Sequence, residues 1–420
     1  MSGMQTQSLF PRPLQARIEE ALSDTPVVLL QGPRQSGKTT LALQVARSRG
    51  HAYVSFDDDA QRSAAHHDPV GYVAELPDRV VLDEVQRVPE LFTSLKAAVD
   101  ARRLAGRFLL TGSSQVLLLP RLADSLAGRM EILCLRPLAQ AEIEGAGDVG
   151  FAAALFGAGV QTGSRCRRMG AALAERIAAG GYPSALERVS SRRRAAWYRD
   201  YIQTLVQRDV RDIARIGALD ALPRLLSLAA AQTARLLNVA ELAAPFQLSR
   251  PTIRDYVTLL TRLFLLEELP PWHSNRLSRL VKTPKLHLGD TGLACALLGI
   301  DGAMLWRDRQ LYGQLLETFV YQELRRQADW TPEPIAFHHF RDKDGLEVDL
   351  VLGMGGRLSG VEVKAGSTVK AEDFRGLRKL KDAIGPAFAR GVVLYDGEAV
   401  IPFGDALQAV PISLLWTPNP

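Results

Sequence analysis

One glycine-rich segment constrains the fold of this chain more than any other feature. Gly32, Gly37, Lys38 and Thr39 have the spacing GxxxxGK followed by Ser or Thr. The apolar run VVLLQ precedes the segment and the helical pattern TTLALQVARS follows it, so we expect a strand, a tight loop and a helix in that order. Such a loop turns backbone N–H groups and a helix N-terminus toward phosphate groups. The segment therefore predicts a phosphate-binding loop (P-loop) in an α/β domain.

The same loop indicates which ligands to expect. Lys38 would place a positive charge near the β- and γ-phosphates of a nucleotide, and the Thr39 hydroxyl would be a Mg²⁺ ligand. ATP and Mg²⁺ are therefore the expected cofactors. The predicted nucleotide contacts are Gly32, Pro33, Arg34, Gln35, Ser36, Gly37, Lys38, Thr39 and Thr40.

An acidic pair follows a second apolar run. Asp83 and Glu84 come directly after the run VVL, and open α/β sheets bind ligands at the carboxyl ends of their strands. We expect Asp83 to hold the Mg²⁺, directly or through water, and Glu84 to orient or deprotonate the attacking water. The alternative is a solvated charge pair at the end of a strand.

Two further groups would complete a site for phosphoryl transfer. The segment RFLLTGSSQ ends in hydroxyls, and we prefer Ser113 over Thr111 as the contact to the γ-phosphate, unless these hydroxyls only cap a turn. Such sites often use an arginine from a neighbouring subunit. We prefer Arg129 over Arg121 for this role, the alternative being a surface salt bridge. An arginine that acts in trans would require a homo-oligomer.

The chain has 420 residues, which is too long for one ordinary core. Short apolar runs alternate with helical patterns as far as Pro137, which is typical of a parallel sheet covered on both faces. Beyond Pro137 the pattern is mainly helical, with a long amphipathic helix expected from Arg192 to Ile216. The predicted domains are a P-loop ATPase core over residues 1–145, a helical lid or linker over 146–216, a winged helix-turn-helix over 217–303 and an α/β domain over 304–420.

The segment from Leu222 to Leu288 has the pattern of a winged helix-turn-helix. Its residues indicate a helix, a turn and a second helix, and the stretch KTPKLHLGD is a candidate wing strand. Ser249 or Arg250 would cap the second helix. In a DNA-binding module Arg250, Thr252 and Arg254 would contact DNA. A lid or a protein-docking module is the alternative.

Four charged residues near the C-terminus form a candidate nuclease-like site. Glu317 falls on an expected helix, Asp349 in EVDLVL, and Glu362 and Lys364 in VEVK. Alternation along a strand places Glu362 and Lys364 on the same face. Asp349 and Glu362 could share a divalent ion that activates water, and Lys364 could stabilise charge on phosphorus. Glu347 is a further candidate ligand.

The E…D…ExK order resembles the restriction-endonuclease-like PD-(D/E)xK core, although no Pro precedes Asp349. The chain as a whole resembles a broad family of bacterial and archaeal AAA-type ATPases that carry a C-terminal domain of unknown function. The resemblance implies an AAA-type fold and ATP binding, and leaves the cellular role open. The residues that carry it are GPRQSGKTT, VVLDEVQ, FLLTGSS, LAGR followed by RPL, GGYP, YIQTLVQRDV, GDTGL, LLETFVYQEL, EVDLVL and VEVK.

Composition excludes few functions. No apolar run approaches the roughly 20 residues that a membrane-spanning helix needs, and the N-terminus lacks the pattern of a signal peptide. We therefore expect a cytoplasmic protein without membrane contact. The net charge of +5 is compatible with nucleic acid, but it is small for this length.

Three hypotheses follow from these patterns. The first is an AAA-type ATPase that couples ATP binding and hydrolysis to rearrangement of its winged-helix and nuclease-like modules, with DNA as a candidate partner. The second is a metal-dependent nuclease switched by ATP. The third is an ATP-dependent regulatory or scaffold protein, in which an inactive nuclease-like domain binds a protein partner.

Overall fold

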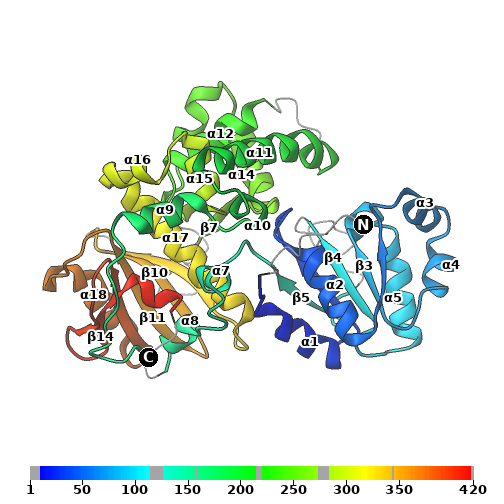
Figure 1. Ribbon diagram of the computed structural model, residues 1–420, viewed down its shortest axis with the longest axis horizontal. Coiled ribbons are helices and arrows are strands. Elements are labelled where there is room, and N and C mark those ends of the chain that lie inside the picture. Colours follow the sequence, from blue (N-terminus) through cyan, green and yellow to red (C-terminus); the bar gives the residue numbers. More distant parts are fainter. Residues whose placement is uncertain are drawn as a thin grey trace.

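The computed structural model of the protein describes residues 10–113, 126–157, 159–213, 220–272, 283–342 and 345–417. This part of the chain forms an N-terminal unit with a parallel sheet, a mainly helical middle unit and a C-terminal unit with a mixed sheet. Figure 1 shows the N-terminal unit in blue and cyan, the middle unit mainly in green, and the C-terminal unit from yellow to red. Among the described helices, none combines the length and the hydropathy required to cross a lipid bilayer.

The N-terminal unit is built on a five-stranded sheet with the order β2-β3-β4-β1-β5, in which all neighbouring strands are parallel. Side chains alternate along β1: Val27 and Leu29 join one buried cluster, and Val28 and Leu30 join another. The helices α4 and α5 cover the first face, and α1 and α2 cover the second. The predicted parallel sheet is thus confirmed. Its elements are α1 (Leu14–Asp24), β1 (Val27–Gln31), α2 (Lys38–Arg49), β2 (Ala52–Ser55), α3 (Asp59–His67), α4 (Pro69–Ala74), β3 (Val80–Asp83), α5 (Leu91–Ala101), β4 (Phe108–Gly112) and β5 (Met130–Cys134).

The middle unit combines helices with a three-stranded antiparallel sheet of order β6-β8-β7. The candidate wing segment forms β8. The hydroxyl of Ser249 caps α14 by accepting a hydrogen bond from the backbone N–H of Thr252 at 3.2 Å. The elements are α7 (Gln140–Glu144), α8 (Phe151–Ala154), α9 (Ala171–Ala179), α10 (Pro183–Leu186), α11 (Ser191–Ile213), α12 (Ala221–Ala231), β6 (Arg235–Leu236), α13 (Val239–Ala243), α14 (Arg250–Arg262), β7 (Leu266–Leu269), β8 (Lys285–Leu288), α15 (Thr291–Leu298) and α16 (Gly302–Arg307).

The C-terminal unit has a long helix and a six-stranded sheet of order β13-β14-β12-β11-β10-β9. Along the chain, β9, β10 and β11 come first and form an antiparallel meander. The helix α18 then connects β11 to β12, which is parallel to β11. The segments EVDLVL and VEVK, expected as strands from the sequence, lie on β10 and β11. The elements are α17 (Arg309–Trp330), β9 (Ala336–Arg341), β10 (Glu347–Met354), β11 (Arg357–Lys364), α18 (Arg375–Ile384), β12 (Phe388–Tyr395), β13 (Ile401–Pro402) and β14 (Leu407–Pro411).

The middle and C-terminal units are packed against each other over a large area. One buried cluster includes Ile177 of α9, Leu315 of α17 and Val361 of β11. The segment that follows the N-terminal unit also lies on the C-terminal sheet, where Ser359 Oγ donates a hydrogen bond to the carbonyl of Leu155 at 3.0 Å. The long helix α17 lies between the helices of the middle unit and the C-terminal sheet (Figure 1). These two units therefore share one hydrophobic core, and the predicted boundary at residues 303 and 304 stays a prediction.

Candidate nucleotide-binding site

The glycine-rich loop lines a cavity of about 430 Å³ between the N-terminal and middle units. Arg34 to Thr40 contribute to its wall, whereas Gly32 and Pro33, also predicted as nucleotide contacts, do not line it. Gly32 has φ +154°, and a Cβ atom there would lie 2.2 Å from the carbonyl oxygen of Leu135. Gly37, with φ +97°, occupies the N-cap of α2. The glycines are thus required by a close backbone approach and by a left-handed turn.

Lys38 is buried within the loop. Its Nζ atom donates hydrogen bonds to the carbonyl oxygens of Gly32 and Pro33, at 2.9 and 2.7 Å. Burial lowers the pKa of Lys38 to about 8, and the nearby carboxylates of Glu84 and Asp83 partly oppose this effect. The loop therefore holds a desolvated ammonium group that the phosphates of a nucleotide could reach.

Asp83 and Thr39 meet below the loop. The Thr39 hydroxyl lies 3.2 and 3.1 Å from the two carboxylate oxygens of Asp83. The hydroxyls of Tyr53 and Thr111 also donate hydrogen bonds to this buried carboxylate. A hydroxyl and a carboxylate are the oxygen donors that Mg²⁺ prefers, so the pair fits the predicted metal. Sequence reasoning missed Tyr53, although its place on β2 beside β3 is the signal that could have shown it.

Glu84 follows directly at the end of β3 and lines the cavity. It has φ +59° and ψ +44°, a left-handed conformation that is uncommon for a residue other than glycine. Its backbone N–H donates to the Thr111 hydroxyl at 3.0 Å, so Thr111 contacts both acidic residues. Ser113 is one step further away, because its hydroxyl accepts from Gln86 at 2.9 Å and Gln86 in turn donates to the Glu84 carboxylate. The catalytic role of Ser113 stays a prediction.

Arg129 lies away from this cavity. It precedes β5, at the amino end of the parallel sheet, whereas the glycine-rich loop follows the carboxyl end of β1. Its Nε atom forms an ion pair with Asp100 at 2.5 Å. The arrangement does not bring Arg129 to the nucleotide site of its own chain, so its predicted role depends on a second copy. Arg121 lies outside the described residues.

Arg12 is a residue of the site that the motif analysis did not reveal. It lines the cavity, and its guanidinium donates to the carbonyl of Ser36 at 2.9 Å and to that of Arg136 at 2.7 Å. It also forms an ion pair with Glu142 at 2.8 Å. No sequence pattern surrounds Arg12, so only the tertiary structure identifies it. The residue ties the glycine-rich loop to the segment that leaves the sheet.

Comparison with known proteins agrees with this geometry. Residues 24–144 match the model of the AAA domain family. Residues 170–303 and 312–415 match two domains of unknown function, DUF8612 and DUF4143. The chain is 32% identical over 407 residues to the uncharacterized protein Rv2008c of Mycobacterium tuberculosis, and this match covers 96% of the chain and 83% of the relative. The uncharacterized protein Mb2031c of Mycobacterium bovis matches over the same lengths at the same identity.

The chain belongs to the family of these two mycobacterial proteins. Its N-terminal unit is an AAA-type P-loop ATPase domain. Among solved structures, the Walker-type ATPase PABY2304 of Pyrococcus abyssi is 16% identical, with a TM-score of 0.44, and the match covers 71% of this chain and 98% of that one.

The AAA-type domain is also contacted by the middle unit. Ser184 Oγ donates to the side-chain oxygen of Gln35 at 3.2 Å, and the Tyr201 hydroxyl donates to the carbonyl of Arg34 at 3.2 Å. Pro183 and Glu187 complete the cavity wall on this side. The GGYP motif therefore leads directly into the nucleotide site.

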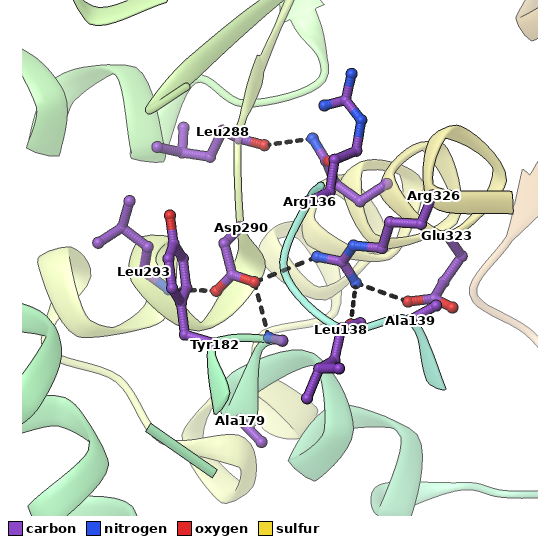
Figure 2. A network of polar contacts seen from close by, with 12 residues as sticks. Arg136, Leu138, Ala139, Ala179, Tyr182, Leu288, Asp290, Leu293, Glu323 and Arg326 are labelled. Carbon is purple, nitrogen blue, oxygen red and sulfur yellow. Dashed lines mark hydrogen bonds and ion pairs between the residues drawn. The ribbon is translucent and has the colours of Figure 1, made fainter. Parts of the chain in front are cut away.

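A buried ionic network lies behind this motif. Figure 2 shows the Asp290 carboxylate facing the guanidinium of Arg326, which also points toward Glu323 and the carbonyl of Leu138. The Asp290 carboxylate accepts hydrogen bonds from the backbone N–H of Gly181 at 2.8 Å and from the Tyr198 hydroxyl at 3.0 Å. Burial raises the pKa of Glu323 to about 6, against the opposing effect of Arg326. The GGYP and GDTGL motifs and α17 thus meet around the guanidinium of Arg326.

The four residues of the candidate nuclease-like site lie near one another, and a fifth charged residue, Lys285, lies among them. Glu317 on α17 and Asp349 on β10 both contact the Nζ atom of Lys285, a residue of the middle unit that sequence reasoning did not select. Glu362 and Lys364 on β11 pair with each other at 3.1 Å. Every one of these ionic groups therefore has a partner within the chain.

Proposed function

We propose that this protein binds Mg²⁺ and ATP through its AAA-type domain and hydrolyses ATP to ADP and phosphate. The observation that carries the proposal is the position of Thr39 and Asp83, whose oxygens lie side by side below the glycine-rich loop, with Glu84 in the wall of the same cavity. The test is phosphate release by the purified protein. We expect Lys38→Ala to abolish it, whereas a variant of the partly exposed Lys96 should be unaffected.

Each group in the cavity has a distinct task. Thr39 and Asp83 would hold Mg²⁺, which would neutralise charge on the β- and γ-phosphates. Lys38 would exchange its hydrogen bonds to loop carbonyls for hydrogen bonds to phosphate oxygens. Glu84 would orient the attacking water and accept its proton, because its carboxylate lines the cavity and its backbone is fixed by Thr111.

We further propose that hydrolysis is coupled to movement of the other units. Arg12 connects the loop carbonyl of Ser36 to Glu142. The same segment is held by α17, since the backbone N–H of Gln140 donates to the Glu323 carboxylate at 2.9 Å. A change in the loop on phosphate binding or release would therefore be transmitted over a short chain of buried contacts to α17.

A homo-oligomer is the proposed working state. Arg129 lies at the amino edge of the sheet and cannot serve its own cavity, so it would act at the nucleotide site of a neighbouring copy. We expect the specific ATPase activity of the wild type to rise with protein concentration, together with the mass in solution measured with ATP. Arg129→Ala should lower the activity without loss of ATP binding. A monomer with constant specific activity would exclude the trans role.

For the middle unit we propose a winged helix-turn-helix fold and duplex DNA as its partner. The order α12, β6, α13, α14, β7 and β8 supports this fold. The exposed Arg250 at the start of α14 is available to a phosphate, whereas Arg254 forms an ion pair with Glu268 at 3.0 Å.

Duplex DNA binding should therefore be weak, because few cationic side chains are available to contact the phosphates. It should fall as the salt concentration rises, because binding releases counterions from the DNA. A fluorescence anisotropy titration at low and physiological salt measures this, with Arg250→Ala reducing affinity at low salt. The absence of binding at low salt would favour a docking module for protein.

A further inference from the structure

Lys285 occupies the centre of the carboxylate cluster in the C-terminal unit. Its Nζ atom lies 2.6 Å from Glu347, 2.7 Å from Glu317 and 3.2 Å from Asp349. These carboxylates belong to α17 and β10, whereas the lysine is the first residue of β8 in the middle unit. Only 2% of the Lys285 side chain is exposed. One ammonium group of the middle unit therefore fills the point at which three carboxylates of another unit converge.

The contacts match an ammonium ion and do not suit a divalent metal. A lysine ammonium has three N–H donors, and it has three carboxylate neighbours here. A divalent cation at the same point would lie against a buried positive charge, which is strongly unfavourable at a few ångströms in a medium of low dielectric. Among the described residues, no group of three His, Cys, Asp or Glu side chains is arranged to hold a metal ion. The cluster thus disagrees with the metal that the E…D…ExK order implied.

The charge states of the cluster agree with this arrangement. Burial would lower the pKa of Lys285, but Glu317, Asp349 and Glu347 outweigh it and raise the pKa well above its usual value. The ammonium therefore stays charged at neutral pH. Burial and the neighbouring Asp349 raise the pKa of Glu362 to about 8, and the contact with Lys364 partly opposes this effect. Asp349 is further satisfied by the backbone N–H of Val363 at 2.9 Å.

The backbone that carries Lys285 is fixed between two strands and against α17. β8 is the central strand of the three-stranded sheet, with β6 on one side and β7 on the other. His287, two residues along the same strand, is buried and hydrogen-bonded to Thr318 of α17 at 3.1 Å. The strand is therefore held against α17 at two points, and the lysine has little freedom to move.

We infer that Lys285 takes the place of a divalent cation in the C-terminal unit, so that the cluster is a set of ion pairs that holds the middle and C-terminal units together. In the wild type the cluster binds neither Mg²⁺ nor Mn²⁺, and the unit does not cleave nucleic acid with their help. This inference goes beyond the proposed ATPase activity and does not depend on it.

The experiment is a Mn²⁺ titration of the full chain without nucleotide, with free Mn²⁺ measured by electron paramagnetic resonance. The wild type and Asp349→Asn should bind Mn²⁺ equally, because the carboxylate already has its cation. Lys285→Met keeps an unbranched side chain that is one atom shorter and removes its charge, and it should gain one Mn²⁺ per chain. The double variant Lys285→Met with Asp349→Asn should lose that additional ion. Mn²⁺ should also raise the melting temperature of Lys285→Met and not that of the double variant.

Two results would overturn the inference. One is a Mn²⁺ ion that the wild type binds and Asp349→Asn does not, which would make the cluster a true metal site. The other is a folded Lys285→Met protein that gains no ion. If Lys285→Met does not fold, the double variant Lys285→Met with Glu317→Gln replaces it, because this pair of substitutions removes one positive and one negative charge. The same Mn²⁺ titration is then expected to show the gain of one Mn²⁺ per chain. Since no nucleotide is present, failure here is separate from failure of the ATPase proposal.

Discussion

Replacing Glu84 with Gln is expected to lower the turnover number for ATP by about 10²- to 10⁴-fold while ATP still binds. The amide has nearly the same shape as the carboxylate and can still accept the hydrogen bond from Gln86, so the cavity should persist. It cannot accept a proton from water. Phosphate release gives the turnover, and titration with a fluorescent ATP analogue gives the affinity.

A matched control for this variant is Glu90→Gln. Glu90 is exposed, follows the same strand and pairs with His66 at the surface. It should therefore keep the wild-type turnover. Turnover that survives in Glu84→Gln would mean that another group activates the water, and the role of the residue after Asp83 would have to be reassigned.

Asp290→Ala is expected to destabilise the protein by about 3–5 kcal/mol, the range found when one partner of a buried ion pair is removed. The substitution removes one of the two carboxylates that contact the buried guanidinium of Arg326, the other being that of Glu323. It also removes the acceptor of the hydrogen bonds from Gly181 and Tyr198. The midpoint of urea unfolding, followed by circular dichroism, measures the effect.

Asp301→Ala is the matched control, since each of the two aspartates caps a helix. Asp301 is exposed and accepts a hydrogen bond from the backbone N–H of Met304 at 2.8 Å, as Asp290 does from that of Leu293 at 3.1 Å. Loss of the cap alone should cost about 1 kcal/mol. Equal effects of the two substitutions would show that Asp290 acts only as a helix cap and that the ion pair adds nothing.

Much of the nucleotide site could be predicted because its parts are encoded locally. The glycine spacing, the apolar run before it and the acids at the end of β3 each depend on a few consecutive residues. The rules of parallel sheets then place the ends of neighbouring strands at one edge. The choice between Thr111 and Ser113 could not be made from local sequence. Which of the two hydroxyls contacts Asp83 and Glu84 depends on the register of β4 against β3. The structure places the Thr111 hydroxyl there.

The sequence by itself determined the phosphate-binding loop, the parallel sheet around it and two strands of the C-terminal unit, β10 and β11, because periodicity and turn chemistry act over short distances along the chain. Only the tertiary structure decided which charges meet. Arg12 reaches Glu142, Asp290 reaches Arg326, and Lys285 enters a cluster whose three acids lie 32 to 64 residues away. Such ion pairs are set by the packing of whole units, and no local pattern can reveal them. The glycine-rich loop could be recognised from its letters, whereas the lysine in the acidic cluster could not.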